Sequence, residues 1–162
     1  MKPFYCILLV IFSSCVALKP LKIQREDNVS NKLKLNGYYI SCGYGKDSSL
    51  YEVIILYSNG VQIGYSERGK INCIIENNNY LSSNDVKLTT YPYNLGVYKI
   101  NDDNTILSEC WISTDYYYKT VQNYGKIVND TTFYLQDNKI GKDTFKFVEF
   151  SPKPDSTNKF IK

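Results

Sequence analysis

Residues 51–65 read YEVIILYSNGVQIGY, and this stretch is the clearest indication of the fold in the chain. Its first eight residues are mostly β-branched, aromatic or aliphatic, a composition typical of a β-strand. The dipeptide Asn59-Gly60 follows and supplies the positive φ angles that a two-residue type I′ turn needs. We therefore expect a β-hairpin whose first strand is apolar on both faces.

The rest of the chain repeats this pattern of short strands and tight turns. Strand-forming segments occupy residues 35–42, 51–58, 61–65, 95–100, 105–113, 116–128, 131–136 and 144–150. We expect the strand over 116–128 to bend or bulge at Gly125. Isoleucines at helical spacing predict one short inserted helix within residues 67–83. About eight sequential antiparallel strands favour an all-β, lipocalin-like barrel.

The N-terminus has the pattern of a secretory signal. Lys2 precedes an apolar run over residues 4–12, which is too short to span a bilayer, and Ser13-Ser14-Cys15 follows. Small residues directly before a cysteine indicate a bacterial lipoprotein signal. We expect residues 1–14 to be removed and Cys15 to carry the lipid, such as palmitate. The alternative is ordinary cleavage after Ala17, which would give a secreted protein.

The mature chain divides into two parts. Residues 15–34 are polar after the signal and lack periodicity, so we expect an anchor followed by a partly disordered tether. Residues 35–162 are long enough for one domain with a sizeable core. We therefore expect a single β-barrel domain over 35–162.

Composition excludes several classes of function. The chain has 19 basic and 16 acidic residues, a net charge of +3, and no basic cluster that would favour nucleic acid. It has no histidine, so the commonest general base, the usual catalytic triads and most zinc sites are absent. We find no catalytic motif, and we expect a protein that is not an enzyme and uses no metal or cofactor.

The cysteines of the domain leave two alternatives open. Cys42, Cys73 and Cys110 show no spacing typical of a metal or redox site. They are either small buried apolar residues, or two of them form a disulfide and the third is a free thiol.

Aromatic residues provide the candidate binding site. Tyr116 and Tyr118, with Trp111 one strand earlier and the loop over 91–93, could form a platform on which a sugar or a flat ligand stacks. The other interpretation is that these side chains fill the core and coat the outer wall. A pair of carboxylates for glycoside hydrolysis, Glu109 and Asp115, is a less favoured hypothesis.

Five segments together resemble a known group of proteins. They are LNGYY at 35–39, YSNG at 57–60, LGVYKI at 95–100, NDTTF at 129–133 and the C-terminal stretch over 147–162. In this order they resemble uncharacterised small lipoproteins of Bacteroidetes. The resemblance implies a lipid-anchored protein of the cell envelope, in the outer membrane or facing the periplasm, and it assigns no functional residues.

Two functions are compatible with these features. The first is a non-enzymatic envelope lipoprotein that is attached to the membrane by its lipid and binds a small apolar or sugar ligand in or at the mouth of the barrel. The alternative is a structural or assembly protein without a pocket. The interior of an eight-stranded barrel can be filled by side chains or hold one small ligand, so its volume distinguishes the two.

Overall fold

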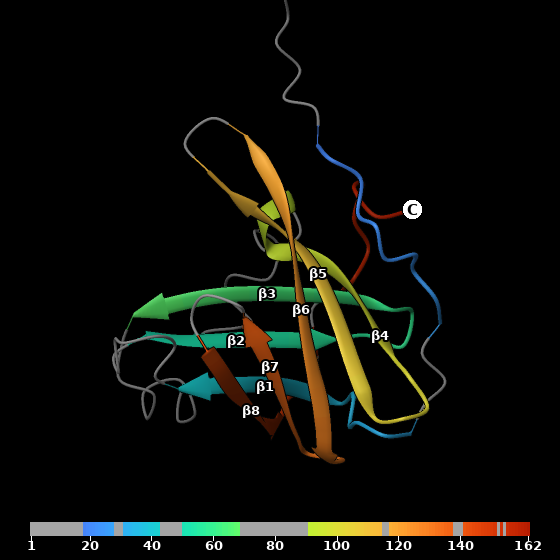
Figure 1. Cartoon of the computed structure of the whole chain (residues 1–162), viewed down its shortest axis with the longest axis vertical. Helices are drawn as coiled ribbons and strands as arrows, with labels where there is room; N and C mark the ends of the chain where they lie inside the picture. Colours follow the sequence, from blue (N-terminus) through green and yellow to red (C-terminus); the bar gives the residue numbers. More distant parts are fainter. Residues whose placement is uncertain are drawn as a thin grey trace, which may run out of the picture.

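The computed structural model describes residues 18–27, 31–42, 50–68, 91–114, 117–137, 141–151, 153 and 155–162. Each strand pairs antiparallel with the next, and β1 pairs with β8 to close a barrel (Figure 1). The strands are β1 Gly37–Cys42, β2 Leu50–Leu56, β3 Val61–Arg68, β4 Leu95–Ile100, β5 Thr105–Ser113, β6 Tyr118–Asn129, β7 Thr132–Asp137 and β8 Gly141–Glu149, and a 3₁₀ turn, η1 Pro92–Asn94, precedes β4. The expected all-β barrel of eight antiparallel strands is confirmed.

The predicted helix over 67–83 lies almost entirely outside the described residues. Its first two residues, Glu67 and Arg68, belong to β3 and pair with β2. The strand pattern therefore extends further along the chain than the sequence indicated.

The hairpin over 51–65 is present, but its turn type was predicted wrongly. The amide of Gly60 donates to the carbonyl of Tyr57, and the amide of Tyr57 donates to Val61, which makes a longer connection than a two-residue turn. Gly60 has a φ of +76°, whereas Asn59 has no positive φ. This is the pattern of a type I turn followed by a left-handed glycine. A side chain at Gly60 would also overlap the carbonyl of Glu26, which crosses directly over it.

The irregularity of β6 also differs from the prediction. Gly125 pairs regularly with Leu135 of β7, and the register shifts later, between Ile127 and Asn129. The bulge therefore lies beside the turn to β7, just before the last pair, Asn129 with Thr132.

The strand β2 is apolar on both faces, and both faces are buried. Ile54 and Leu56 point into the barrel, while Val53 and Ile55 point outward; none of the four side chains is more than 3% exposed. The protein consequently has two hydrophobic cores, one inside the barrel and one on its outer wall.

The inner core fills only one end of the barrel. Tyr39 packs against Phe133 with ring centroids 4.9 Å apart and against Phe147 at 5.4 Å, and Phe133 stacks on Phe145 at 5.1 Å. We call this the closed end; it carries the turns after β2, β4 and β6. Leu33, in the segment before β1, joins this core and is 4% exposed.

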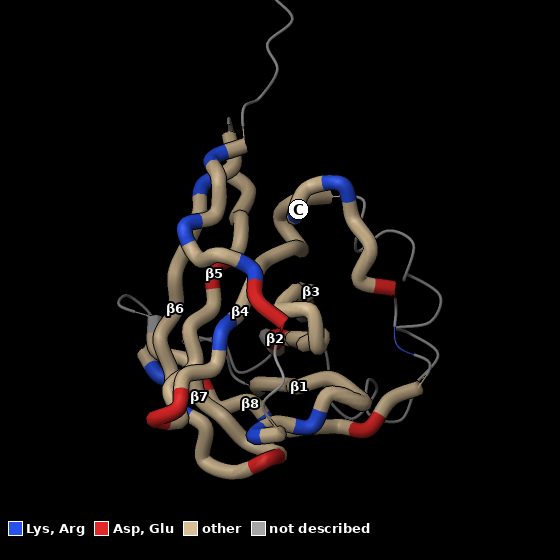
Figure 2. Tube along the Cα trace, turned by 90° about the vertical axis from the view of Figure 1, so that its right-hand side faces the viewer, with Lys and Arg blue, Asp and Glu red and all other residues tan. Residues whose placement is uncertain are grey.

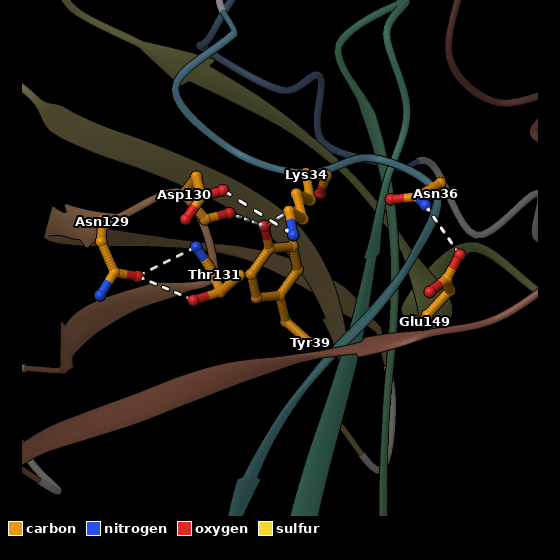
Figure 3. Close-up of polar contacts among 7 residues, drawn as sticks. All are labelled: Lys34, Asn36, Tyr39, Asn129, Asp130, Thr131 and Glu149. Atoms are coloured by element: carbon orange, nitrogen blue, oxygen red, sulfur yellow. Dashed lines mark hydrogen bonds and ion pairs between the residues drawn. The ribbon is translucent and has the colours of Figure 1, made fainter.

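Polar contacts seal the closed end (Figure 3). The hydroxyl of Tyr39 lies 2.9 Å from the carbonyl oxygen of Lys34 and 3.1 Å from that of Asp130, and burial raises the pKa of this phenol. Beside it, Oδ1 of Asn129 accepts hydrogen bonds from the amide and hydroxyl of Thr131. The side-chain amide of Asn36 donates a hydrogen bond to the carboxylate of Glu149. The segment before β1 is thus bonded to the turn after β6 and to the end of β8.

The outer core is covered by the two ends of the described chain. We call residues 18–27 the N-terminal strap and residues 150–151, 153 and 155–162 the C-terminal arm. Leu18, Leu21 and Ile23 of the strap pack on the outer face of β1 to β5, as do Phe160 and Ile161 of the arm. Residues 18–27, which we expected to belong to a partly disordered tether, therefore lie along the barrel (Figure 1).

A half-buried lysine holds the C-terminal arm in place. Nζ of Lys153 lies 2.6 Å from the carbonyl oxygens of both Leu35 and Leu56, and 4.2 Å from the ring centroid of Tyr57. Burial lowers the pKa of this amine to about 8. Lys153 thus ties the arm to the segment before β1 and to the end of β2.

Candidate functional site

We call the end opposite the closed end the open end. Toward it, the strands turn polar residues into the barrel and apolar residues outward, the reverse of the usual arrangement. In β3, the apolar residues Val61 and Ile63 face outward to the covered outer core, while Gln62, Gly64 and Ser66 alternate with them and face inward. The same alternation in β5 and β6 turns small or polar residues into the barrel. Small and polar side chains leave space that the aromatic rings fill at the closed end.

This space is a cavity of about 640 Å³, a size typical of small-molecule sites. Its apolar lining is Ile54, Tyr65, Tyr93, Ile112, Val121 and Leu135, and its polar lining includes Glu52, Gln62, Ser66, Ser108, Cys110, Lys119 and Asn123. The lining comes from β2, β3, β5, β6, β7 and η1. A ligand with both apolar and polar parts would match these walls.

Part of the polar lining is already hydrogen-bonded within the protein. The hydroxyl of Ser108 donates to Oε1 of Gln62 over 2.9 Å, and both side chains are buried. Asn123 lies opposite Ser108 on β6, and its Oδ1 is buried without a hydrogen-bond partner among the described residues. A buried acceptor without a donor costs about 1–3 kcal/mol, so this atom favours a water or a ligand that donates to it.

Cys110 places a thiol in the cavity wall. It is a free cysteine next to Val121 on the inner face, and the side chain of Cys42 and all of Cys73 lie outside the described residues. Burial, together with the negative charges of Glu52 and Glu109, raises the pKa of this thiol to about 12. The thiol is therefore protonated at neutral pH and contributes a weakly polar contact rather than a nucleophile.

Three tyrosines form a stack at the open end. The rings of Tyr91 and Tyr93 lie 5.4 Å apart at 14°, and those of Tyr93 and Tyr118 lie 6.5 Å apart at 19°. Tyr91 is 47% exposed and Tyr93 is 42% exposed, although Tyr93 also lines the cavity. Of the residues in the predicted platform, the structure brings together Tyr118 and the loop over 91–93, while Tyr116 lies outside the described residues.

Trp111 does not join this stack or the cavity. Side chains alternate along β5, so Cys110 faces inward and Trp111 faces the outer core, where it is 3% exposed. Its Nε1 donates to the carbonyl oxygen of Lys19 over 2.7 Å. Trp111 was predicted to bind a ligand; in the structure it lies outside the cavity and holds the N-terminal strap.

Glu109 occupies the same outer face as Trp111. Its Oε2 accepts hydrogen bonds from the amides of Lys22 at 2.6 Å and Ile23 at 2.8 Å, and its side chain is fully buried. Oε1 has no hydrogen-bond partner among the described residues. The strap thus covers the carboxylate that the hydrolase hypothesis requires, and the proposed partner Asp115 lies outside the described part of the chain.

Side-chain hydrogen bonds hold the turn between β4 and β5. Oδ1 of Asp103 accepts from the amide and hydroxyl of Thr105, and these bonds lower the pKa of the Asp103 carboxyl group. Within the described ranges, no group of three histidine, cysteine or acidic side chains is placed to hold a metal ion. Cys15, the predicted lipid attachment site, lies outside these ranges.

Comparisons with known proteins give no relative for this chain. No family model, curated protein or solved structure matches it. In the part of the chain that the structure describes, no helix has the length and apolarity needed to cross a membrane. The function is therefore inferred from the geometry of the barrel.

Replacing Glu109 tests how the strap is held. Glu109→Ala removes the acceptor of two strap amides, so we expect trypsin to cleave the full chain after Lys22 and Arg25 roughly tenfold faster or more, since the lost bonds are worth about 1–3 kcal/mol. Glu109→Gln keeps an oxygen acceptor and should be cleaved at the wild-type rate. Equal rates for Glu109→Ala and wild type would contradict this role of the carboxylate.

Proposed function

We propose that this protein is a lipid-anchored binding module of the cell envelope that holds a small amphipathic molecule in the open half of its barrel. The observation that carries the proposal is the cavity of about 640 Å³. Such a cavity can enclose a small organic molecule, and a structural or assembly role gives no reason for this space.

The position of the two hydrophobic cores, away from the open end, supports a binding role. The closed end is packed with aromatic rings, and the outer wall is covered by the strap and the arm. The residues at the open end can therefore contribute to recognition without supplying the main hydrophobic cores. A protein that used its whole interior for stability would place large apolar side chains at Gln62, Ser66 and Ser108 as well.

The chemistry of the walls indicates the kind of molecule. Ile112, Val121 and Leu135 offer apolar contacts, while Oδ1 of Asn123 and the carboxylate of Glu52 are acceptors. A ligand with a short apolar portion and a hydroxyl or amino group would contact both kinds of wall. Burial raises the pKa of the Cys110 thiol, so this group is protonated at neutral pH and does not act as a nucleophile.

The anchor is the second part of the proposal. Its support is the order of a basic residue, an apolar run and Ser13-Ser14-Cys15 at the N-terminus. A lipid on Cys15 would attach the barrel to a membrane.

Filling the cavity tests the binding site. Val121→Trp places a large side chain in the cavity, and Tyr124→Trp places the same side chain on the exposed outer face of the same strand. We expect wild type and Tyr124→Trp to bind the amphipathic probe anilinonaphthalene sulfonate saturably. The affinity of Val121→Trp for the probe should be lower by a factor of roughly ten or more. Circular dichroism would verify that each variant is folded. Equal binding by the two variants would place the probe elsewhere and contradict the proposal.

Replacing the predicted lipid attachment site tests the anchor. In a bacterium that processes lipoproteins, Cys15→Ala should move the protein from the membrane fraction to the soluble fraction, whereas Cys42→Ala should leave it in the membrane. Intact-mass analysis of the wild type should find an acylated cysteine at the N-terminus. An unmodified chain beginning at Leu18 would show that cleavage follows Ala17 instead.

A further inference from the structure

Charge is distributed unequally along the long axis of the molecule. Figure 2 shows basic residues along the whole molecule, whereas acidic residues lie mainly in its middle and lower parts. The strap follows this gradient, because Lys19 and Lys22 precede Glu26 and Asp27. Contacts to β4 and β5 fix its direction: Lys19 lies beside Trp111 near the end of β5, and Glu26 lies beside Lys99 near the end of β4.

The lysines at the two ends of the barrel differ in their partners. At the closed end, Lys99 forms an ion pair with Glu26 at 2.8 Å, and Lys34 lies 3.9 Å from Asp130. At the open end, Lys19, Lys22 and Lys119 form no ion pair with any described residue, and the first two are exposed. Asp115, in the connection between β5 and β6, lies outside the described residues. Among the described residues, these three lysines therefore have no ion-pair partner.

Exposed aromatic rings occupy the same end. Tyr117 is 52% exposed and precedes Tyr118, on which Tyr93 stacks, and Tyr91 continues the stack outward. Lys119 follows in β6 and lines the mouth of the cavity together with Tyr93. We call Tyr91, Tyr93, Tyr117, Lys19, Lys22 and Lys119 the open-end surface. Tyrosine and lysine together are typical of protein surfaces that lie at the headgroup level of a bilayer.

The N-terminal strap begins at this end, because the carbonyl oxygen of Lys19 accepts the hydrogen bond of Trp111 near the end of β5. Cys15 precedes Lys19 by four residues, which span at most about 14 Å when extended. The carbonyl of Lys19 is bonded to Trp111, so the barrel cannot move far from a lipid on Cys15. This step rests on the anchor in the proposed function.

We propose that the open-end surface rests on an anionic bilayer, with the mouth of the cavity facing the lipid headgroups. The three exposed tyrosines insert their rings among the headgroups, and the three lysines contact lipid phosphates. Each lysine near such a surface favours the bound state roughly fivefold. The short link to Cys15 keeps this surface at high effective concentration near the membrane, so weak contacts suffice to orient the barrel. A ligand would then enter the cavity from the membrane surface.

Fluorescence quenching by the bilayer tests this orientation. The full chain, purified from the membranes of the expressing cells, is reconstituted into vesicles of phosphatidylcholine with about a third phosphatidylglycerol, in which the phosphatidylcholine carries bromine near the headgroup. Trp111 is the only tryptophan and is 3% exposed in the outer core, so it is left in place and its emission is the constant background against which an added tryptophan is measured. In this background, Tyr93→Trp should be quenched roughly twofold, because interfacial aromatic rings contact the brominated segment. Val128→Trp, 63% exposed beside the turn after β6, should be unaffected.

Charge reversal provides a matched control. Replacing Lys19, Lys22 and Lys119 by glutamate should abolish the quenching of Tyr93→Trp, whereas replacing the exposed Lys126, Lys142 and Lys146 by glutamate should not. Quenching of Val128→Trp as strong as that of Tyr93→Trp would overturn the proposal, as would no quenching at either position. Failure of the chain to sediment with the vesicles would instead reject the anchor.

Hydrogen exchange on the unaltered chain tests the same contact without a substitution. In anionic vesicles, the amides of residues 91, 93, 94 and 117–120 should exchange more slowly than in neutral detergent micelles, and the turn over 101–104 should exchange at the same rate in both. The same rate at all three segments would contradict the proposed contact.

Discussion

The structure depends on the burial of an apolar sheet on both of its faces. Val53 and Ile55 on the outer face of β2 are as deeply buried as Ile54 and Leu56 on the inner face. A barrel alone buries only its inner face, so the outer wall must be covered by chain from outside the sheet. The strap and the arm provide this cover, and two charged side chains hold them: Glu109 binds strap amides, and Lys153 binds carbonyls of the barrel.

This second core explains why the barrel can remain partly empty. A barrel of eight strands can fill its interior with side chains or hold one small ligand. Here, aromatic rings fill only the closed end, and the hydrophobic contacts on the outer wall add to the stability of the sheet. At the open end, the inner face can therefore carry Gln62, Ser108 and Asn123, which leave a cavity with apolar and polar walls. The proposed binding function follows from this distribution of burial.

The sequence predicted the strands well because their pattern is local. Alternation, β-branched residues and turn dipeptides are properties of adjacent residues, and the eight strands and the barrel followed from them. The hairpin after β2 was predicted, but its turn type depends on Glu26, which crosses over Gly60 from a distant part of the chain. The bulge near Ile127 similarly depends on pairing with β7.

The site was harder to predict because the outer face of the sheet is buried as well as the inner one. Each face of β5 carries both apolar and polar residues, so their alternation did not tell which face points inward, and Trp111 was placed in the binding site while Cys110 was not. One signal was available: in VQIGYS, residues 61–66, polar or small residues alternate with apolar ones. This alternation identifies the cavity wall only together with the N-terminal strap, which covers the apolar outer face of the sheet.

A crystal structure of the protein purified from its own membranes, without added ligand, would show whether the cavity holds a molecule. We expect continuous electron density for one small molecule between β3, β5 and β6, with a donor atom within hydrogen-bond distance of Oδ1 of Asn123. A cavity closed by inward movement of the lining side chains, or one that holds only water, would contradict this expectation.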